Sequence, residues 1–151
     1  MKVEGIENLN PDDFKADVIY SDMESTGNIT TQNDKVNRLF QNVIWGQKSN
    51  FVDSPTDCPQ RDERLGWTGD ANVFSNTALL NMNAYAFYRK FLKDVAIEQK
   101  LNDGRAPMYA PAFGNEDGGG AIWGDATTFV PWNAYQATGD ASILTEHYDA
   151  M

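Results

Sequence analysis

The stretch from Asp53 to Asp70 reads DSPTDCPQRDERLGWTGD. It contains five carboxylates, two arginines, two prolines and two glycines, and its one aliphatic side chain is Leu65. Such a segment cannot form a core helix, because it has little to bury and its prolines and glycines interrupt any helical repeat. Trp67 and the mixed charges distinguish it from a flexible linker. Apolar helical patterns flank it, so the sequence predicts an ordered polar loop between buried helices, where functional sites are often built.

The charged side chains of this loop favour acid–base chemistry. Four of its carboxylates lie close together in the sequence: Asp57, Asp62, Glu63 and Asp70. Two arginines, Arg61 and Arg64, lie among them. Crowded carboxylates raise one another's pKa while arginines lower it, so the cluster can separate protonated from ionised members. A neutral carboxylic acid beside ionised neighbours is what a glycosidase needs to protonate a leaving oxygen, and Trp67 offers a flat face to a sugar. The alternative is an arginine–carboxylate network that only holds the loop in place.

The run from Asp57 to Asp70 resembles the signature of bacterial α-L-rhamnosidases, glycoside hydrolase family 78. The resemblance implies that Glu63 is the general acid. It also implies that Asp57, Trp67 and Asp70 bind the rhamnose, and that Arg61 or Asp62 orients neighbouring groups. Rhamnose-containing glycosides are the substrates that it implies.

A second segment, Trp123-Gly124-Asp125-Ala126 followed by Pro131-Trp132, is similar to another part of that family. There Trp123 would line the sugar pocket and Asp125 would lie at its rim. The alternative for Trp123 is a side chain that anchors the loop by packing.

Composition restricts the partners. Hydrophobic residues make up 41% of the 151 positions and aromatic residues 12%, which is typical of a globular domain with a sizeable core. The formal net charge of −10 argues against nucleic acid and anionic membrane surfaces, and no apolar run is long enough to span a bilayer. Neither the composition nor the resemblance implies a cofactor or a metal.

Cys58 is the only cysteine, so neither an internal disulfide nor a zinc site of several thiolates can form. His147 is the only histidine and lies far from Cys58 in the sequence, which argues against a catalytic Cys–His pair. We expect Cys58 to be a buried structural thiol and His147 to lie on the exposed side of a terminal helix.

The hydrophobic periodicity predicts a mainly α chain. Alternation predicts a half-buried strand over 14–20, and a second short strand is expected over 28–31. A long loop is expected over 105–120. Helices are expected over 34–49, 71–100, 126–137 and from 141 onward, with Asp70 and Asp125 as N-caps.

Loop–helix pairs of this kind predict helix hairpins, and the resemblance implies a partial (α/α)6 barrel. We expect residues 1–32 to be the end of a preceding β-domain and its linker. Residues 33–151 would be the first part of the catalytic barrel, truncated at its C-terminus, because six hairpins need about twice this length or more. Uncovered helix faces would then promote self-association.

The family is inverting, which requires an acid and a base about 6.5–9.5 Å apart with a water between them. The resemblance places the base beyond Met151, so we expect the chain alone to hydrolyse little or nothing. Other hypotheses remain: another glycosidase or lyase on the same toroid, a non-catalytic carbohydrate-binding module with Trp67 and Trp123 as platforms, or a metal site on Asp57, Asp62 and Asp70.

Overall fold

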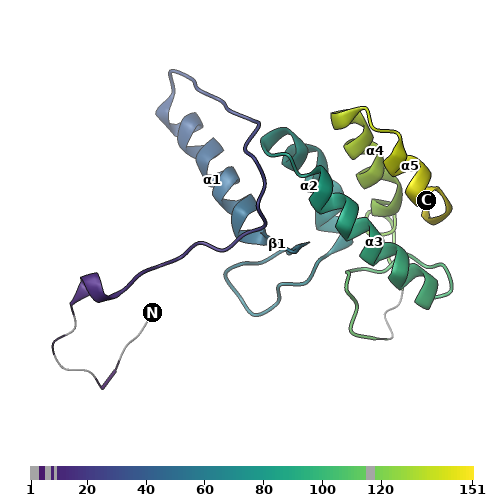
Figure 1. Ribbon diagram of the computed structural model, residues 1–151, viewed down its shortest axis with the longest axis horizontal. Coiled ribbons are helices and arrows are strands. Elements are labelled where there is room, and N and C mark those ends of the chain that lie inside the picture. Colours follow the sequence, from purple (N-terminus) through teal and green to yellow (C-terminus); the bar gives the residue numbers. More distant parts are fainter. Residues whose placement is uncertain (1–3, 6–7, 9, 115–117) are drawn as a thin grey trace.

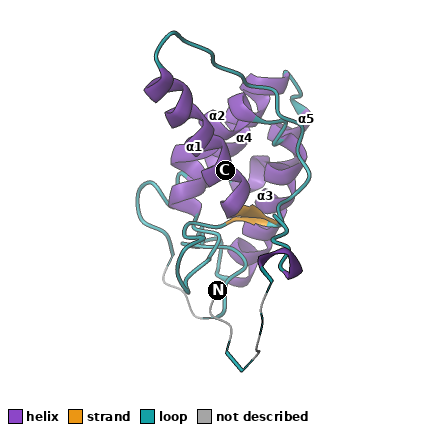
Figure 2. Cartoon of the chain, turned by 90° about the vertical axis from the view of Figure 1, so that its left-hand side faces the viewer, coloured by secondary structure: helices purple, strands orange, loops and turns teal. Residues whose placement is uncertain are grey.

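The computed structural model describes residues 4–5, 8, 10–114 and 118–151, and helices dominate it (Figure 1, Figure 2). Along the described chain the elements are a 3-10 turn Pro11–Asp13, α1 (Asp34–Asn50), β1 (Phe51–Val52), β2 (Ser54–Pro55), α2 (Thr68–Asn81), α3 (Tyr85–Leu101), α4 (Ala126–Thr138), α5 (Ser142–His147) and a 3-10 turn Tyr148–Ala150. The mainly α fold class is confirmed.

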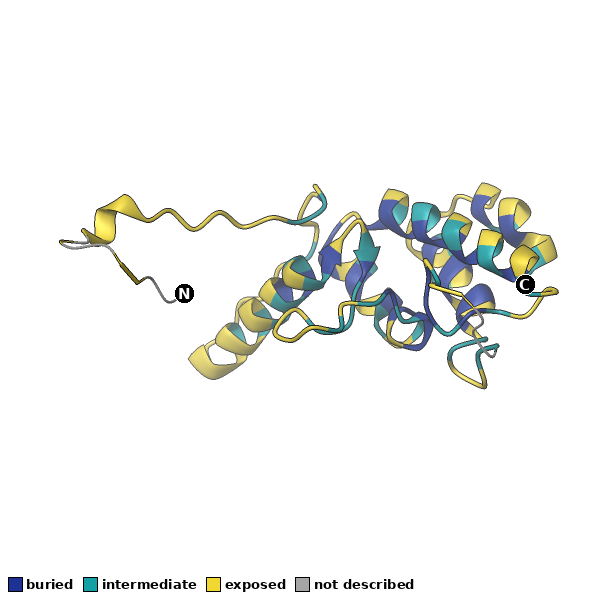
Figure 3. Ribbon diagram, turned by 90° about the horizontal axis from the view of Figure 1, so that it is seen from below, coloured by how far each residue is buried: buried dark blue, intermediate teal, exposed yellow. Residues whose placement is uncertain are grey.

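Helices α2 to α5 pack as a bundle, with α4 in contact with α2, α3 and α5. Its core contains fully buried aromatic and aliphatic side chains, among them Tyr88, Phe91, Val130, Ala134 and Ile143. Helix α1 lies to one side of this bundle (Figure 1), and most buried residues lie away from it (Figure 3). The buried core therefore lies mainly between the four helices that follow the polar loop, α2 to α5.

Phe51 connects α1 to this bundle. It follows the last residue of α1 and is 3% exposed. Its ring stacks on Phe87 with centroids 4.5 Å apart, and it meets Phe74 and Tyr88 edge-on at 6.1 Å and 5.8 Å. Aromatic groups packed in this way bury a large apolar area. Phe51 thus fixes the start of the polar loop against α2 and α3.

The helix predicted over 71–100 is divided into α2 and α3. Met82 between them is extended, with φ −144° and ψ 156°. The backbone of residues 24–27 occupies this break: Asn83 N–H donates to the carbonyl of Glu24, and two amides of the segment donate to the carbonyl of Asn81. No proline or glycine marks the break in the sequence. It forms because a distant segment satisfies the backbone groups that a continuous helix would have used.

The strands predicted over 14–20 and 28–31 are wrong. Residues 14–19 are extended but exposed, with Val18 at 56% and Ile19 at 76%, whereas Tyr20 is half-buried; the segment runs away from the bundle (Figure 3). Alternation does not make a strand unless a neighbour pairs with it, and none does so here among the described residues. The strands that do form, β1 and β2, make a two-stranded hairpin at the start of the polar loop. The domain boundary after residue 32 stays a prediction.

The bounds of α1 and α4 and the start of α5 agree closely with the predicted ones, but the burial of one residue of α5 does not. His147 at the end of α5 is 3% exposed, so the predicted exposed position is wrong. The reason is tertiary, because α5 packs against both α3 and α4. None of the described helices has the length and apolar character needed to cross a membrane.

Candidate active site

The polar loop is tethered where it starts. The Thr56 hydroxyl donates to the carbonyl of Asn50 at 2.8 Å, and the Thr56 amide donates to the same carbonyl at 2.9 Å. Asp53 has a positive φ of 66°, and its carboxylate contacts Lys90 Nζ of α3 at 2.8 Å. These contacts close the β1–β2 hairpin and direct the chain toward the charged residues that follow.

The end of the loop is anchored on the long segment that follows α3. The Thr68 hydroxyl donates to the carbonyl of Pro107 at 3.0 Å, and the amide of Ala110 donates to the carbonyl of Gly66 at 3.0 Å. A Cβ on Gly66 would collide with the carbonyl oxygen of Ala110, so only glycine fits this approach. Trp67 meets Tyr109 edge-on, with ring centroids 5.2 Å apart. The loop is therefore ordered by contacts at both ends, as predicted.

Glu63 lies at the centre of the charged cluster. Its Oε1 accepts a hydrogen bond from Trp67 Nε1 at 3.1 Å, and its Oε2 lies 2.6 Å from an Arg61 guanidinium nitrogen. The same Arg61 nitrogen lies 3.9 Å from Asp57 Oδ2. The Glu63 side chain is 33% exposed and that of Arg61 61%. The structure thus brings four of the predicted site residues together in direct contact.

Asp57 and Cys58 form the buried edge of this cluster. The Asp57 side chain is 8% exposed, and Cys58 Sγ lies 2.7 Å from its Oδ2 as a hydrogen-bond donor. Asp57 Oδ1 is buried without a hydrogen-bond partner. Cys58 is half-buried rather than fully buried. Its thiol therefore contacts a carboxylate of the charged cluster instead of packing in the core.

A metal site on Asp57, Asp62 and Asp70 does not assemble. Among the described residues, the group of three potential ligands at this place is Asp57, Cys58 and Glu63, whose ligand atoms lie within 4.8 Å of one another. Arg61 contacts two of them, and its positive charge would oppose the binding of a metal cation at this place. Asp62 is exposed and lies outside this group.

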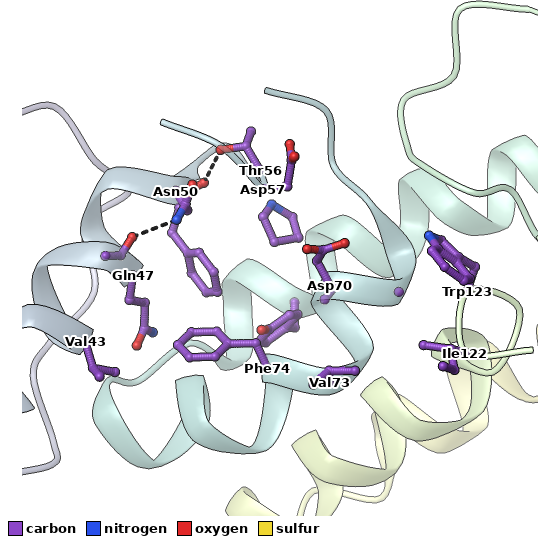
Figure 4. Close-up of a pocket in the computed structure, with 16 residues that line it drawn as sticks. Val43, Gln47, Asn50, Thr56, Asp57, Asp70, Val73, Phe74, Ile122 and Trp123 are labelled. Carbon is purple, nitrogen blue, oxygen red and sulfur yellow. Dashed lines mark hydrogen bonds between the residues drawn. The ribbon is translucent and has the colours of Figure 1, made fainter. Parts of the chain in front are cut away.

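A cavity of about 570 Å³ opens beside the cluster, between the C-terminal part of α1, the β1–β2 hairpin and the N-terminal part of α2 (Figure 4). Three predicted site residues line it, namely Asp57, Asp70 and Trp123. The other five lie outside its lining and are Arg61, Asp62, Glu63, Trp67 and Asp125. This volume is within the range of ordinary ligand pockets and exceeds what a single sugar ring requires.

Asp70 lies in the first turn of α2, at the wall of this cavity (Figure 4). It was expected to be the N-cap, but the helix begins at Thr68 and Trp67 takes the cap position without a side-chain bond. Asp70 is exposed as a residue, but partial desolvation of its carboxyl, followed by the negative charges of Asp57 and Glu63, raises the pKa of Asp70 above its usual range. Asp70 therefore holds a proton to higher pH than an isolated aspartate, as crowding of carboxylates predicts.

Trp123 lies over the start of α2. A Cβ on Gly69 would fall 2.9 Å from the indole nitrogen, so glycine is needed for this approach. The indole N–H is buried without a partner on a residue that lines the cavity. Asn72 Nδ2 donates to the carbonyl of Ile122 at 2.9 Å and holds the loop. Asp125 precedes α4, but its Oδ2 accepts from the amide of Ile122 at 3.0 Å and makes no cap bond with the helix.

Comparison with known proteins shows which family has this arrangement. Residues 24–151 match the family described as the bacterial alpha-L-rhamnosidase 6 hairpin glycosidase domain. The chain belongs to this α-L-rhamnosidase family. The matched range contains both segments on which the resemblance rests, and the helices α1 to α5 are part of the six-hairpin fold.

Relatives in the rhamnosidase family are much longer than this chain. An α-L-rhamnosidase of Formosa agariphila is 42% identical over 137 residues, which are 91% of this chain and 15% of the relative. One of Streptomyces avermitilis is 44% identical over 129 residues, which are 85% and 12%. The chain thus spans about an eighth to a seventh of the length of these curated relatives.

Solved rhamnosidase structures share the fold. The Streptomyces avermitilis enzyme complexed with L-rhamnose superposes with a TM-score of 0.83 at 44% identity, over 87% of this chain and 13% of that one. The Aspergillus terreus enzyme gives the same TM-score at 42% identity, over 87% and 15%.

Sequence reasoning missed two cavity-lining residues that carry buried polar atoms without partners. They are Asn50, with its Oδ1, and Tyr88, with its hydroxyl. Burial raises the pKa of Tyr88 far above its usual range, so its hydroxyl stays protonated. Both residues lie in helices with strong apolar patterns, where a single polar side chain gives no signal of its own. Only the contact of Phe51, at the end of α1, with the bundle places them at one cavity.

Proposed function

We propose that this chain carries the general acid and one wall of the sugar pocket of an inverting α-L-rhamnosidase that acts on terminal α-L-rhamnose. The observation that supports this most is the Glu63 carboxyl, held by Trp67 and Arg61 beside the buried Asp57. The names of the relatives support rhamnose as the sugar.

Each side chain has a role suited to its surroundings. Glu63 would protonate the glycosidic oxygen, while Asp57 and Asp70 would accept hydrogen bonds from sugar hydroxyls. Trp123 would donate its unpaired indole N–H to the sugar, and Trp67 would present its ring face. These five side chains would all act on a single sugar ring bound at the cavity wall.

Arg61 has to change partners for this mechanism. A guanidinium 2.6 Å from Glu63 stabilises the carboxylate anion, whereas a general acid must hold a proton. The Arg61 side chain is 61% exposed, so moving it costs little burial. We propose that substrate draws Arg61 away from Glu63, and that the exposed Asp62 helps to hold it there.

Inversion also needs a base on the opposite face of the sugar, about 6.5–9.5 Å from the acid. A carboxylate oxygen of Asp57 lies within 4.8 Å of one of Glu63, which is closer than an inverting acid and base require and suits sugar binding rather than water activation. We propose that the base belongs to a segment outside residues 1–151. The chain alone should then turn over an aryl α-L-rhamnoside at or near the uncatalysed rate, and clear turnover that Glu63→Gln abolishes would contradict this.

A chimaera tests the acid directly. The chain replaces the equivalent segment of the 44% identical Streptomyces avermitilis enzyme, and hydrolysis of an aryl α-L-rhamnoside is measured. Glu63→Gln should lower kcat by about 10²- to 10⁴-fold, the usual contribution of general acid catalysis. Glu24→Gln, the same change at an exposed position outside the cluster, is the matched control and should leave kcat unchanged. If Glu63→Gln leaves kcat intact while L-rhamnose still binds, the chain is a carbohydrate-binding wall without the acid.

We also propose that isolated copies associate with one another. Large apolar side chains are exposed on α1 to α4, among them Leu39 and Trp45 on α1, Val73 and Leu80 on α2, Ile97 on α3, and Phe129 and Trp132 on α4. Patches of this kind on a small domain promote association with a second copy, although the net charge of −10 opposes it at low salt. Sedimentation should show dimers that increase with ionic strength, and a monomer at every salt concentration would refute the proposal.

A further inference from the structure

The two oxygens of the Asp57 carboxylate have different surroundings. Oδ2 accepts from Cys58 Sγ at 2.7 Å and has Arg61 at 3.9 Å, whereas Oδ1 is buried and has no hydrogen-bond partner. The side chain is 8% exposed and the residue lines the cavity of about 570 Å³. An acceptor that is buried and unpaired on a cavity wall requires a donor from elsewhere, and a ligand hydroxyl supplies one.

Cys58 is the group that distinguishes the two oxygens. The Arg61 nitrogen at 3.9 Å is too distant for a hydrogen bond and has its shorter contact with Glu63 at 2.6 Å. Without the thiol, Asp57 would lack a close donor on either oxygen. Since the terminal torsion of an aspartate is broad and nearly two-fold, its carboxylate would then be free to rotate.

The thiol is also in the right protonation state to donate. Its hydrogen bond to Asp57, followed by burial, raises the pKa of Cys58 above its ordinary value, while the nearby Arg61 acts in the opposite direction. At neutral pH the sulfur therefore carries its proton. A neutral thiol is a poor nucleophile and a weak but usable hydrogen-bond donor.

We propose that Cys58 is a positioning residue for ligand binding: its S–H holds Asp57 Oδ2, so that Oδ1 is left as the unpaired acceptor for a sugar hydroxyl at the cavity wall. Cys58 acts through Asp57 and does not touch the ligand. This inference rests on the proposed function, because it assumes that a sugar occupies the cavity.

Binding of L-rhamnose to the full chain, measured by calorimetry, tests the proposal with three variants. Cys58→Ser keeps a donor and should bind within about 3-fold of the unaltered chain, whereas Cys58→Ala and Cys58→Val should each weaken binding by about 3- to 10-fold, the effect of one hydrogen bond. Thermal melts identify any variant that is unfolded. Equal affinities of the serine and alanine variants, both folded, would overturn the proposal.

A second measurement does not depend on rhamnose. The pH dependence of Cys58 alkylation by iodoacetamide reports on the thiol itself, and Asp57→Asn should move it to lower pH because the carboxylate no longer disfavours the thiolate. An unchanged profile would show that the thiol does not bond to Asp57 and would overturn the inference. If the profile moves but neither the unaltered chain nor its chimaera with the Streptomyces avermitilis enzyme binds L-rhamnose, the proposed function fails while the thiol–carboxylate contact stands.

Discussion

Trp67 Nε1 donates a hydrogen bond to Glu63 Oε1 at 3.1 Å, across four positions of the loop. The indole therefore orients the proposed acid from one side while Arg61 contacts its other oxygen at 2.6 Å. Trp67 is itself held by Tyr109, so the orientation of Glu63 depends on the segment after α3.

Replacing Trp67 by phenylalanine tests this relationship. Phenylalanine keeps a ring against Tyr109 but lacks the N–H, so Glu63 loses one of its two partners. We expect L-rhamnose affinity to fall by about 3- to 10-fold, which is the effect of one hydrogen bond. Trp45→Phe, at an exposed position of α1, is the matched control and should leave the affinity unchanged. Equal effects of the two substitutions would argue against a specific role for the indole N–H.

The aromatic contact of Phe51 should dominate the stability of the loop. Phe51→Ala removes a ring that is 3% exposed and stacked on Phe87 at 4.5 Å, so the free energy of unfolding should fall by about 3–5 kcal/mol. Val52→Ala changes the adjacent residue, which is 42% exposed, and should cost much less. Denaturant titration of both variants measures the difference, and similar losses would show that the stacked rings are not the anchor.

Two glycines should respond to alanine in opposite directions. A Cβ on Gly27 would collide with the backbone carbonyl of Leu80 and lie 3.0 Å from the Cα of Asn81, whereas a Cβ on Gly46 would meet nothing within 4 Å. Gly27→Ala should therefore destabilise the chain by about 1–3 kcal/mol. Gly46→Ala, inside α1, should stabilise it by about 0.5–1 kcal/mol. Thermal melts of both variants measure these changes. A Gly27→Ala variant with an unchanged melting temperature would mean that residues 24–27 do not dock at the break between α2 and α3.

Stability should decrease on mild acidification because of His147. Its burial lowers its pKa below the ordinary value, and the positive charges of Lys93 and Arg89 act in the same direction, while Glu146 opposes them. The unfolded chain then takes up the proton first, so this contribution is complete above about pH 6.5 and is lost as the pH falls from there toward the folded pKa. Melting temperatures between about pH 7.5 and 5.5 should fall less steeply for His147→Gln. Parallel slopes would exclude His147 as the source.

The sequence by itself determined the helical class, the bounds of α1, and the polar loop with its cluster of carboxylates and arginines. These follow from local rules: an apolar stripe at helical spacing must be buried, and a loop rich in charge, proline and glycine cannot be. The contact of Glu63 with Trp67 was within reach of the same reasoning, because only three residues of one short loop separate them.

Tertiary structure alone decided the break at Met82, the burial of His147 and the cavity that joins Asn50 and Tyr88 to Asp57. In each case the backbone or side-chain groups are satisfied or buried by segments far away in the sequence. Local sequence preferences cannot predict such partners, because the free energy of a hydrogen bond or of a buried surface depends on which distant segments pack against it in the fold. The predicted strands failed for the same reason: their alternation was real, but no neighbouring strand among the described residues pairs with them.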